Sequence, residues 1–281
     1  MENYLSMILH YLERVGVSTA IQLFVLFGPL LLLALIMNLI SNLTEKLGPR
    51  VFGEKTFLYL FRSVGTPVHE LGHALFALIF LHRITGIKLF DPVAADGSYG
   101  YVQHSYKKGN IYQETGRFFI GIGPVIMGSV MLYLITWLLF GFSLSDISPV
   151  AITTGTVTRL SSLKTLAIGI YDGLGRFLSL VFDGPGSSWW KIVLLFYFLF
   201  SIGSSITLSP PDIKGALSGL FFFVAILLVF NLLTLWAGEF TVEALTAVSG
   251  FFSGFYFLMI LSIIINAVFV GLLGLLRLVV R

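Results

Sequence analysis

The sequence contains no cysteine among its 281 residues. Disulfide bonds and thiolate metal ligands are therefore excluded, and any bound metal has to be held by histidine, aspartate or glutamate. Charge is also scarce, since Asp, Glu, Lys and Arg together make up 11% of the chain, compared with about 25% in soluble domains. So small a charged fraction excludes an ordinary soluble domain.

The few charges that remain show little excess of either sign. The formal net charge is +3 at pH 7. A small excess of cations is typical of the loops that orient membrane spans, and it does not indicate a nucleic-acid partner. We therefore expect the lipid bilayer, and no nucleic acid, among the partners of this chain.

What the chain has instead is long hydrophobic runs, and hydrophobic residues make up 57% of it. A run of about 20 such residues is long enough to span a bilayer as a helix. Six runs approach or exceed this length: 20–42, 56–82, 117–141, 189–208, 213–237 and 253–278. They predict an all-α, multi-pass integral membrane protein with about six transmembrane helices, in which residues 1–281 form a single membrane-embedded domain.

Two connections between these runs are more polar than the runs themselves. Residues 83–116 are polar and rich in glycine, with a β-like piece over 100–106 that follows the turn signal Asp96-Gly97. Residues 160–182 mix apolar and basic side chains, which is typical of a helix that lies on the membrane interface. The alternative for this second segment is a shallow re-entrant stretch. We expect a short β-hairpin in the first connection and a helix in the second.

The second hydrophobic run carries His69-Glu70-Leu71-Gly72-His73, an H-E-x-x-H motif. On a helix this motif is a zinc-hydrolase signature. The two histidines lie about 40° apart around the axis and roughly 6 Å apart along it, so both can reach one metal. Glu70 lies about 100° from His69, beside the metal, where a general base is needed. The alternative is a pair of interfacial histidines satisfied by backbone carbonyls, and Glu70 would then need a buried partner of its own.

A catalytic zinc site needs a third protein ligand. The best candidate is Asp212, because Pro210-Pro211 just before it breaks the helix between the fourth and fifth runs. Non-helical backbone at membrane depth is tolerated where it is buried in protein or lines a cavity. The alternative role for Asp212 is to cap the following helix. Asp172 is the second candidate for the third ligand, and His82 and His104 are less suitable ligands.

Taken in order, these residues resemble the site-2 protease family of intramembrane zinc metalloproteases. The stretch HELGHALFALIF, which begins at His69, matches the zinc helix of that family, and Gly100-Tyr101-Val102 resembles the G-Y-V of the hairpin that follows it. Gly123-Pro124 resembles the step at the start of the next core span, and Ser209–Gly215 resembles the segment that delivers the third ligand. The chain departs from the usual family pattern at Ser204, where an asparagine is expected.

The resemblance implies a three-helix zinc-protease core within about 56–237, with Zn²⁺ held by His69, His73 and Asp212 and with Glu70 as the catalytic base. It implies a zinc metalloendopeptidase that hydrolyses peptide bonds of membrane-spanning or membrane-associated protein substrates, in the plasma membrane of a prokaryote. No PDZ module or other soluble regulatory domain is expected. The alternative is a catalytically silent zinc-binding membrane regulatory protein, with a channel or transporter ranked below it. Substrate identity, regulation, membrane orientation and oligomeric state stay open.

Overall fold

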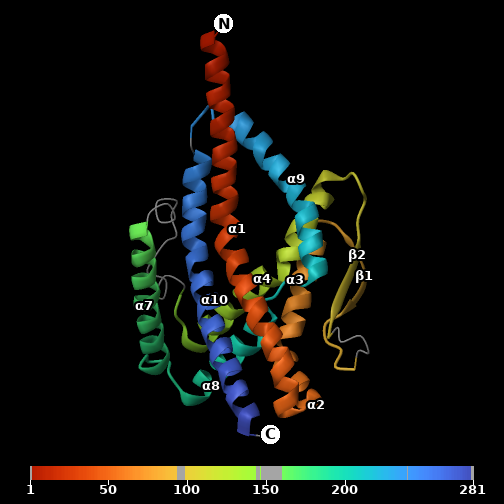
Figure 1. Cartoon of the computed structure of the whole chain (residues 1–281), viewed down its shortest axis with the longest axis vertical. Helices are drawn as coiled ribbons and strands as arrows, with labels where there is room; N and C mark the ends of the chain where they lie inside the picture. Colours follow the sequence, from red (N-terminus) through yellow and green to blue (C-terminus); the bar gives the residue numbers. More distant parts are fainter. Residues whose placement is uncertain (1, 94–98, 144–145, 147–159, 239, 280–281) are drawn as a thin grey trace.

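The computed structural model describes residues 2–93, 99–143, 146, 160–238 and 240–279. The described chain is mostly helical, with one two-stranded hairpin (Figure 1). In chain order the elements are α1 (Glu2–Phe52), α2 (Glu54–Phe57), the π-helical turn η1 (Leu58–Arg62), α3 (Gly65–Ile79), β1 (Arg83–Lys88), β2 (Tyr101–Ser105), α4 (Ile111–Phe140), α7 (Leu160–Phe182), α8 (Trp189–Ser201), the 3₁₀ turn η2 (Gly203–Ser205), α9 (Pro210–Thr234) and α10 (Phe240–Val279).

Four of the described helices are long and apolar enough to cross a membrane, judged by length and composition. They are α1 over Tyr4–Phe52, α4 over Ile111–Phe140, α9 over Pro210–Thr234 and α10 over Gly254–Arg277. These helices support the prediction of a membrane protein, and the hairpin after the H-E-x-x-H helix is present as expected.

The other two predicted spans are divided into shorter elements. Residues 56–82 are shared among α2, η1 and α3, and residues 189–208 form α8 and η2. Helix α3 has 15 residues and is therefore about 22 Å long, which is shorter than a hydrocarbon core of about 30 Å. Four long apolar helices are therefore shown in the described part of the chain, and the count of about six transmembrane helices stays a prediction. The break after α8 falls at Gly203–Ser205, where small polar residues favour turns over continued helix.

Both elements that the sequence predicted in the long connections are present. Strands β1 and β2 pair antiparallel, from Arg83 opposite Ser105 to Lys88 opposite Tyr101. The predicted turn at Asp96-Gly97 lies outside the described residues. The sheet has two strands in the described part of the chain, so β2 keeps one edge that no described strand covers. The helix predicted over 160–182 is α7.

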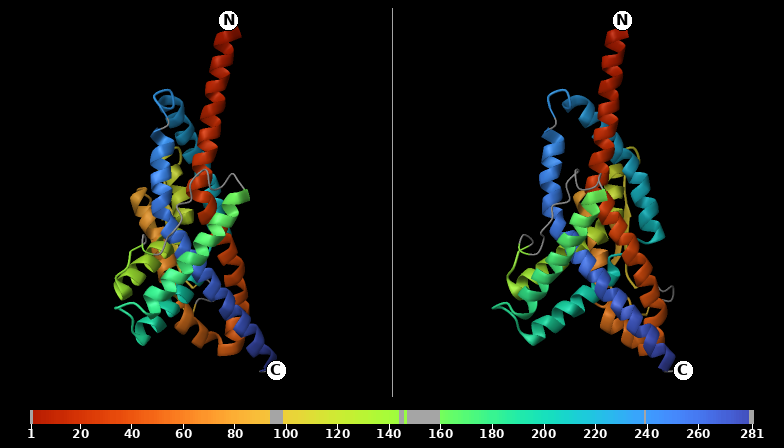
Figure 2. Two further views of the ribbon diagram at one scale, coloured as in Figure 1. Left: turned by 90° about the vertical axis from the view of Figure 1, so that its left-hand side faces the viewer. Right: turned by 60° about the vertical axis from the view of Figure 1, so that its left-hand side comes forward.

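Helices α1 and α10 pack against each other and run in the same direction along the molecule (Figure 2). In the view of Figure 1, α7 lies on one side of this pair, and α3, α9 and the hairpin lie on the other. Apolar side chains of α1, α4, α8 and α10 fill the space between the helices, including Met37, Leu132, Leu199 and Leu258, which are almost fully buried. The core thus gives α3 and α4 a fixed support.

Helices α3 and α4 approach each other closely at two glycines. A β-carbon on Gly72 would lie 2.7 Å from the backbone of Gly123, and one on Gly123 would lie 2.6 Å from the carbonyl oxygen of Gly72. Real side chains essentially never show such distances, so either side chain would push the helices apart. Small residues at helix contacts let backbones approach in this way. The contact sets the H-E-x-x-H motif directly against α4.

Candidate metal centre

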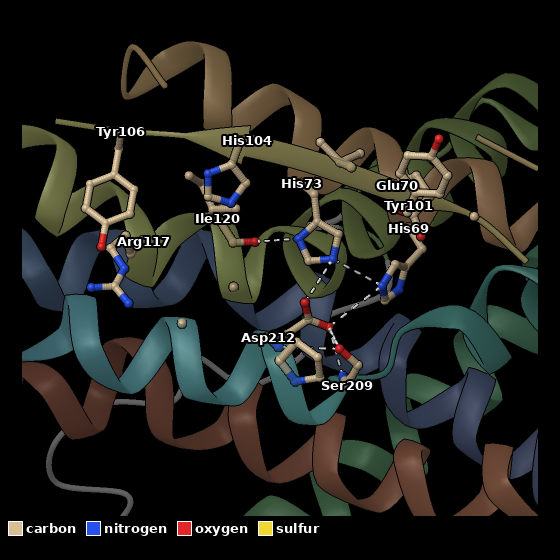
Figure 3. Close-up of a pocket in the computed structure, with 15 residues that line it drawn as sticks. His69, Glu70, His73, Tyr101, His104, Tyr106, Arg117, Ile120, Ser209 and Asp212 are labelled. Carbon is tan, nitrogen blue, oxygen red and sulfur yellow. Dashed lines mark hydrogen bonds and ion pairs between the residues drawn. The ribbon is translucent and has the colours of Figure 1, made fainter. Parts of the chain in front are cut away.

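Three side chains that the sequence singled out meet in one place (Figure 3). Nε2 of His73 lies 3.2 Å from Nε2 of His69 and 3.3 Å from Oδ1 of Asp212. Nε2 of His69 lies 4.0 Å from Oδ2 of Asp212. The candidate ligand atoms all lie within 4.8 Å of one another. The three side chains therefore surround a space that one metal ion can occupy.

The breaks in the predicted spans explain how the candidate ligands meet. His69 and His73 lie in the N-terminal two-thirds of α3, and Asp212 lies in the first turn of α9. Helix α9 starts at Pro210, directly after the N-cap residue Ser209. A negative side chain is favoured in the first turn of a helix, because the unpaired N–H groups there carry partial positive charge. The start of α9 is thus a stable place for the carboxylate.

Backbone carbonyls orient both imidazole rings. Nδ1 of His69 lies 2.8 Å from the carbonyl oxygen of Ser205, and Nδ1 of His73 lies 2.8 Å from that of Ile120. A carbonyl oxygen accepts and cannot donate, so each Nδ1 carries the hydrogen. In the neutral ring, Nε2 then keeps its lone pair and faces the other candidate ligands. A hydrogen bond of this kind on the far nitrogen is what holds a metal-binding histidine in place.

Asp212 serves the helix and the candidate site at once. Its Oδ2 accepts hydrogen bonds from the backbone N–H of Ser209 at 2.8 Å and from Oγ of Ser209 at 2.6 Å. Its own N–H donates to Oγ of Ser209, which completes a capping box. Oδ1 is the oxygen that faces His73. The two roles that the sequence left as alternatives for Asp212 are therefore compatible.

The donor set fits a zinc ion. Two neutral imidazole nitrogens and one carboxylate are among the protein ligands of catalytic zinc sites, which keep a fourth position for water or substrate. His69, His73 and Asp212 would hold the ion, with their side chains only 11–15% exposed. Each of the three side chains is also oriented by a hydrogen bond to the protein backbone. The site is thus preorganised by the fold.

Glu70 stands beside the ligands and is not one of them. The residue is 7% exposed, and it borders the same cavity as the candidate ligands. No described residue forms a hydrogen bond or ion pair with its carboxylate. Gly100, the residue just before β2, approaches it closely, because a β-carbon there would lie 2.8 Å from Cγ of Glu70. Burying an unpaired carboxylate costs free energy. This cost is explained if Glu70 acts on water or substrate.

The cavity in front of Glu70 has a volume of about 570 Å³. The metal-ligand candidates, the start of α9 and strand β2 line it together with Arg117 of α4. Asp172, the second candidate for the third ligand, lies exposed on α7 and does not border this cavity. His82 and His104 are not among the grouped ligands, and they contact each other instead.

Sequence reasoning missed Arg62, which is 5% exposed. Its Nη1 donates to the carbonyl oxygen of Ser204 at 3.2 Å and to Oγ of Ser205 at 3.3 Å. Its Nη2 donates to the carboxylate of Glu45 at 2.5 Å. Arg62 therefore holds the η2 turn, whose Ser205 carbonyl in turn orients His69. A lone arginine inside a hydrophobic run is the signal that could have identified it.

Replacing Arg62 by methionine is expected to lower zinc affinity about 10- to 100-fold, which is the usual effect of removing a group that orients a metal ligand. The fold should survive, because the carboxylate of Glu45 is 47% exposed and stays hydrated without its partner. Competition against a fluorescent zinc chelator measures the affinity of the detergent-purified protein. Arg50→Met, at an exposed position near the end of α1, is the matched control. Equal affinity in both variants would contradict this role of Arg62.

No protein-family model, curated protein or solved structure matches this chain. Function is therefore inferred from the arrangement of His69, Glu70, His73 and Asp212 and from the apolar helices that surround them.

Proposed function

We propose that this protein is an intramembrane zinc metalloprotease of the site-2 protease type, which hydrolyses peptide bonds of membrane-spanning or membrane-associated proteins. One observation carries the proposal: two oriented histidines and an aspartate converge next to an unpaired, buried glutamate, in a cavity between apolar helices. The sequence resemblance points to the same activity and to a prokaryotic plasma membrane.

The chemical roles follow from the positions of the side chains. His69, His73 and Asp212 would hold zinc. A zinc ion bound there polarises a carbonyl group and lowers the pKa of water towards about 7. Glu70 accepts a proton from the attacking water and then gives it to the amine that leaves, as a general base and acid. Its lack of a partner among the described residues keeps the carboxylate available for this transfer.

A substrate helix has to unwind before its peptide bonds can be attacked, because helical hydrogen bonds cover them. Strand β2 offers a place for the unwound segment. One edge of β2 is not covered by a described strand, and Gly100, Tyr101 and Val102 border the cavity. An extended peptide can add to such an edge by main-chain hydrogen bonds. A peptide bound along this edge would therefore border the same cavity as Glu70.

The proposal is tested by removing and restoring the metal. The full chain is reconstituted in liposomes with a panel of single-span reporter proteins, and the fragments are followed by gel electrophoresis. We expect 1,10-phenanthroline to abolish cleavage and added Zn²⁺ to restore it, whereas the non-chelating 1,7-phenanthroline should have no effect. Cleavage that resists the chelator would contradict a metalloprotease. Full zinc occupancy without cleavage of any reporter would favour the silent, zinc-binding regulatory protein.

A further inference from the structure

His104 is the histidine that borders the cavity without belonging to the metal-ligand group. It lies on β2, so it comes from a different element than the candidate ligands on α3 and α9. Figure 3 shows its ring between β2 and the candidate metal site, near His73. No described residue hydrogen-bonds its Nε2. The side chain thus presents one ring nitrogen that the rest of the described chain leaves unpaired.

The other ring nitrogen of His104 is fixed by His82. The two Nδ1 atoms lie 2.9 Å apart, and His82 is 4% exposed. Nε2 of His82 lies 2.8 Å from the carbonyl oxygen of Gln113, at the start of α4. The side chain of Gln113 donates to the carbonyl oxygen of Leu81 at 2.7 Å. Gln113 is therefore also tied to the residue just before His82. A hydrogen-bonded chain therefore runs from α4 through His82 to His104.

This chain determines which atoms carry hydrogens. The Gln113 carbonyl can only accept, so Nε2 of His82 carries a hydrogen. In a neutral ring, Nδ1 of His82 then has only a lone pair and accepts from Nδ1–H of His104. Nε2 of a neutral His104 is therefore left with its lone pair. The arrangement presents a hydrogen-bond acceptor to the cavity.

The surroundings keep both rings neutral. Burial lowers the pKa of His104 to about 4, with a further contribution from His82. Burial also lowers the pKa of His82. The ring of Tyr106 stacks on His82 at a centroid distance of 5.2 Å, and the guanidinium of Arg117 lies 5.0 Å from the centre of the Tyr106 ring. A nearby positive charge further disfavours a positive imidazolium.

We propose that Nε2 of His104 accepts a hydrogen bond from a backbone N–H of the peptide that lies in this cavity, and that His82 is the positioning residue that keeps His104 in the accepting form. The inference rests on the proposed function, since it names a substrate-binding group of the same site. His104 in this form cannot serve as an oxyanion donor, because a donor would need a hydrogen on Nε2. The ligand it recognises is an extended peptide main chain.

The binding test uses a peptidyl hydroxamate, which attaches to zinc through its hydroxamate group. A series of analogues replaces each backbone N–H in turn by an ester oxygen. Affinities are measured by isothermal titration calorimetry with the zinc-loaded full chain in detergent. At one position of the series, we expect the wild type to bind the parent amide roughly tenfold more tightly than the ester analogue, which is the usual effect of one hydrogen bond. His104→Leu should lose this preference, His104→Gln should retain part of it, and His10→Leu, an exposed control on α1, should behave as the wild type.

Nitrogen-15 NMR of the histidine rings tests the hydrogen positions without any ligand. We expect the spectrum of His104 at neutral pH to show a hydrogen on Nδ1 and none on Nε2, and His82→Leu to remove this preference. A hydrogen on Nε2 of His104 in the wild type would overturn the inference. An amide preference that is equal in the wild type and in His104→Leu would also overturn it, while the proposed metalloprotease would stand. Hydroxamate binding that does not depend on zinc would contradict the proposed function and the inference with it.

Discussion

Replacing Glu70 by glutamine is expected to lower metal-dependent cleavage by about 10²- to 10⁴-fold, the usual contribution of a general acid–base group. Glutamine has nearly the shape of glutamate, so the contact of residue 70 with Gly100, just before β2, should be kept. What is lost is the ability to take a proton from water and to give it to the leaving amine. Zinc content should stay at the wild-type level, because Glu70 does not belong to the ligand group.

The measurement combines a cleavage assay in liposomes with metal analysis of the same preparation. Glu13→Gln is the matched control, since the Glu13 side chain is 70% exposed on α1 and faces no part of the cavity. We expect this control to cleave and to bind zinc as the wild type does. If Glu70→Gln cleaved its substrate at the wild-type rate, Glu70 would not be the base.

Replacing His73 by alanine is expected to remove stoichiometric zinc from the purified protein. The change deletes one of the three candidate ligands and leaves a gap beside the Ile120 carbonyl that orients the ring. Asp212→Ala should also lose zinc, and in addition should destabilise the start of α9 by about 1 kcal/mol through the lost capping box. Inductively coupled plasma mass spectrometry measures the metal, and circular dichroism in detergent checks the helix content.

Two further variants separate ligand loss from cap loss. Ser209→Ala removes both side-chain contacts to Asp212 but leaves its carboxylate in place, so we expect zinc affinity to fall about 10- to 100-fold without disappearing. Asp172→Ala should bind zinc as the wild type does, because Asp172 lies exposed on α7. Full zinc in Asp212→Ala, or zinc loss in Asp172→Ala, would show that the third ligand is assigned wrongly.

The membrane class and the histidine pair could be read from the sequence because both depend on local properties. Hydrophobic runs act through their own length and composition, and four of them are long apolar helices. His69 and His73 are four residues apart, so any helix there brings them to one face. Asp212 could be chosen because Pro210 and Pro211 favour the first turn of a helix, and α9 starts at Pro210. The exposed position of Asp172 could not be read from the sequence, since its neighbours suit a solvated helix and a site equally well.

The tertiary structure alone decided how these residues are supported. The carbonyl that orients His69 belongs to Ser205, 136 residues away, and the one that orients His73 belongs to Ile120, 47 residues away. Every residue has a carbonyl, so no sequence pattern marks the two that matter. The same holds for Arg62 on the η2 turn and for the contact between His82 and His104. Periodicity encodes which face of a helix a side chain occupies, but the packing of distant segments decides which polar groups meet there.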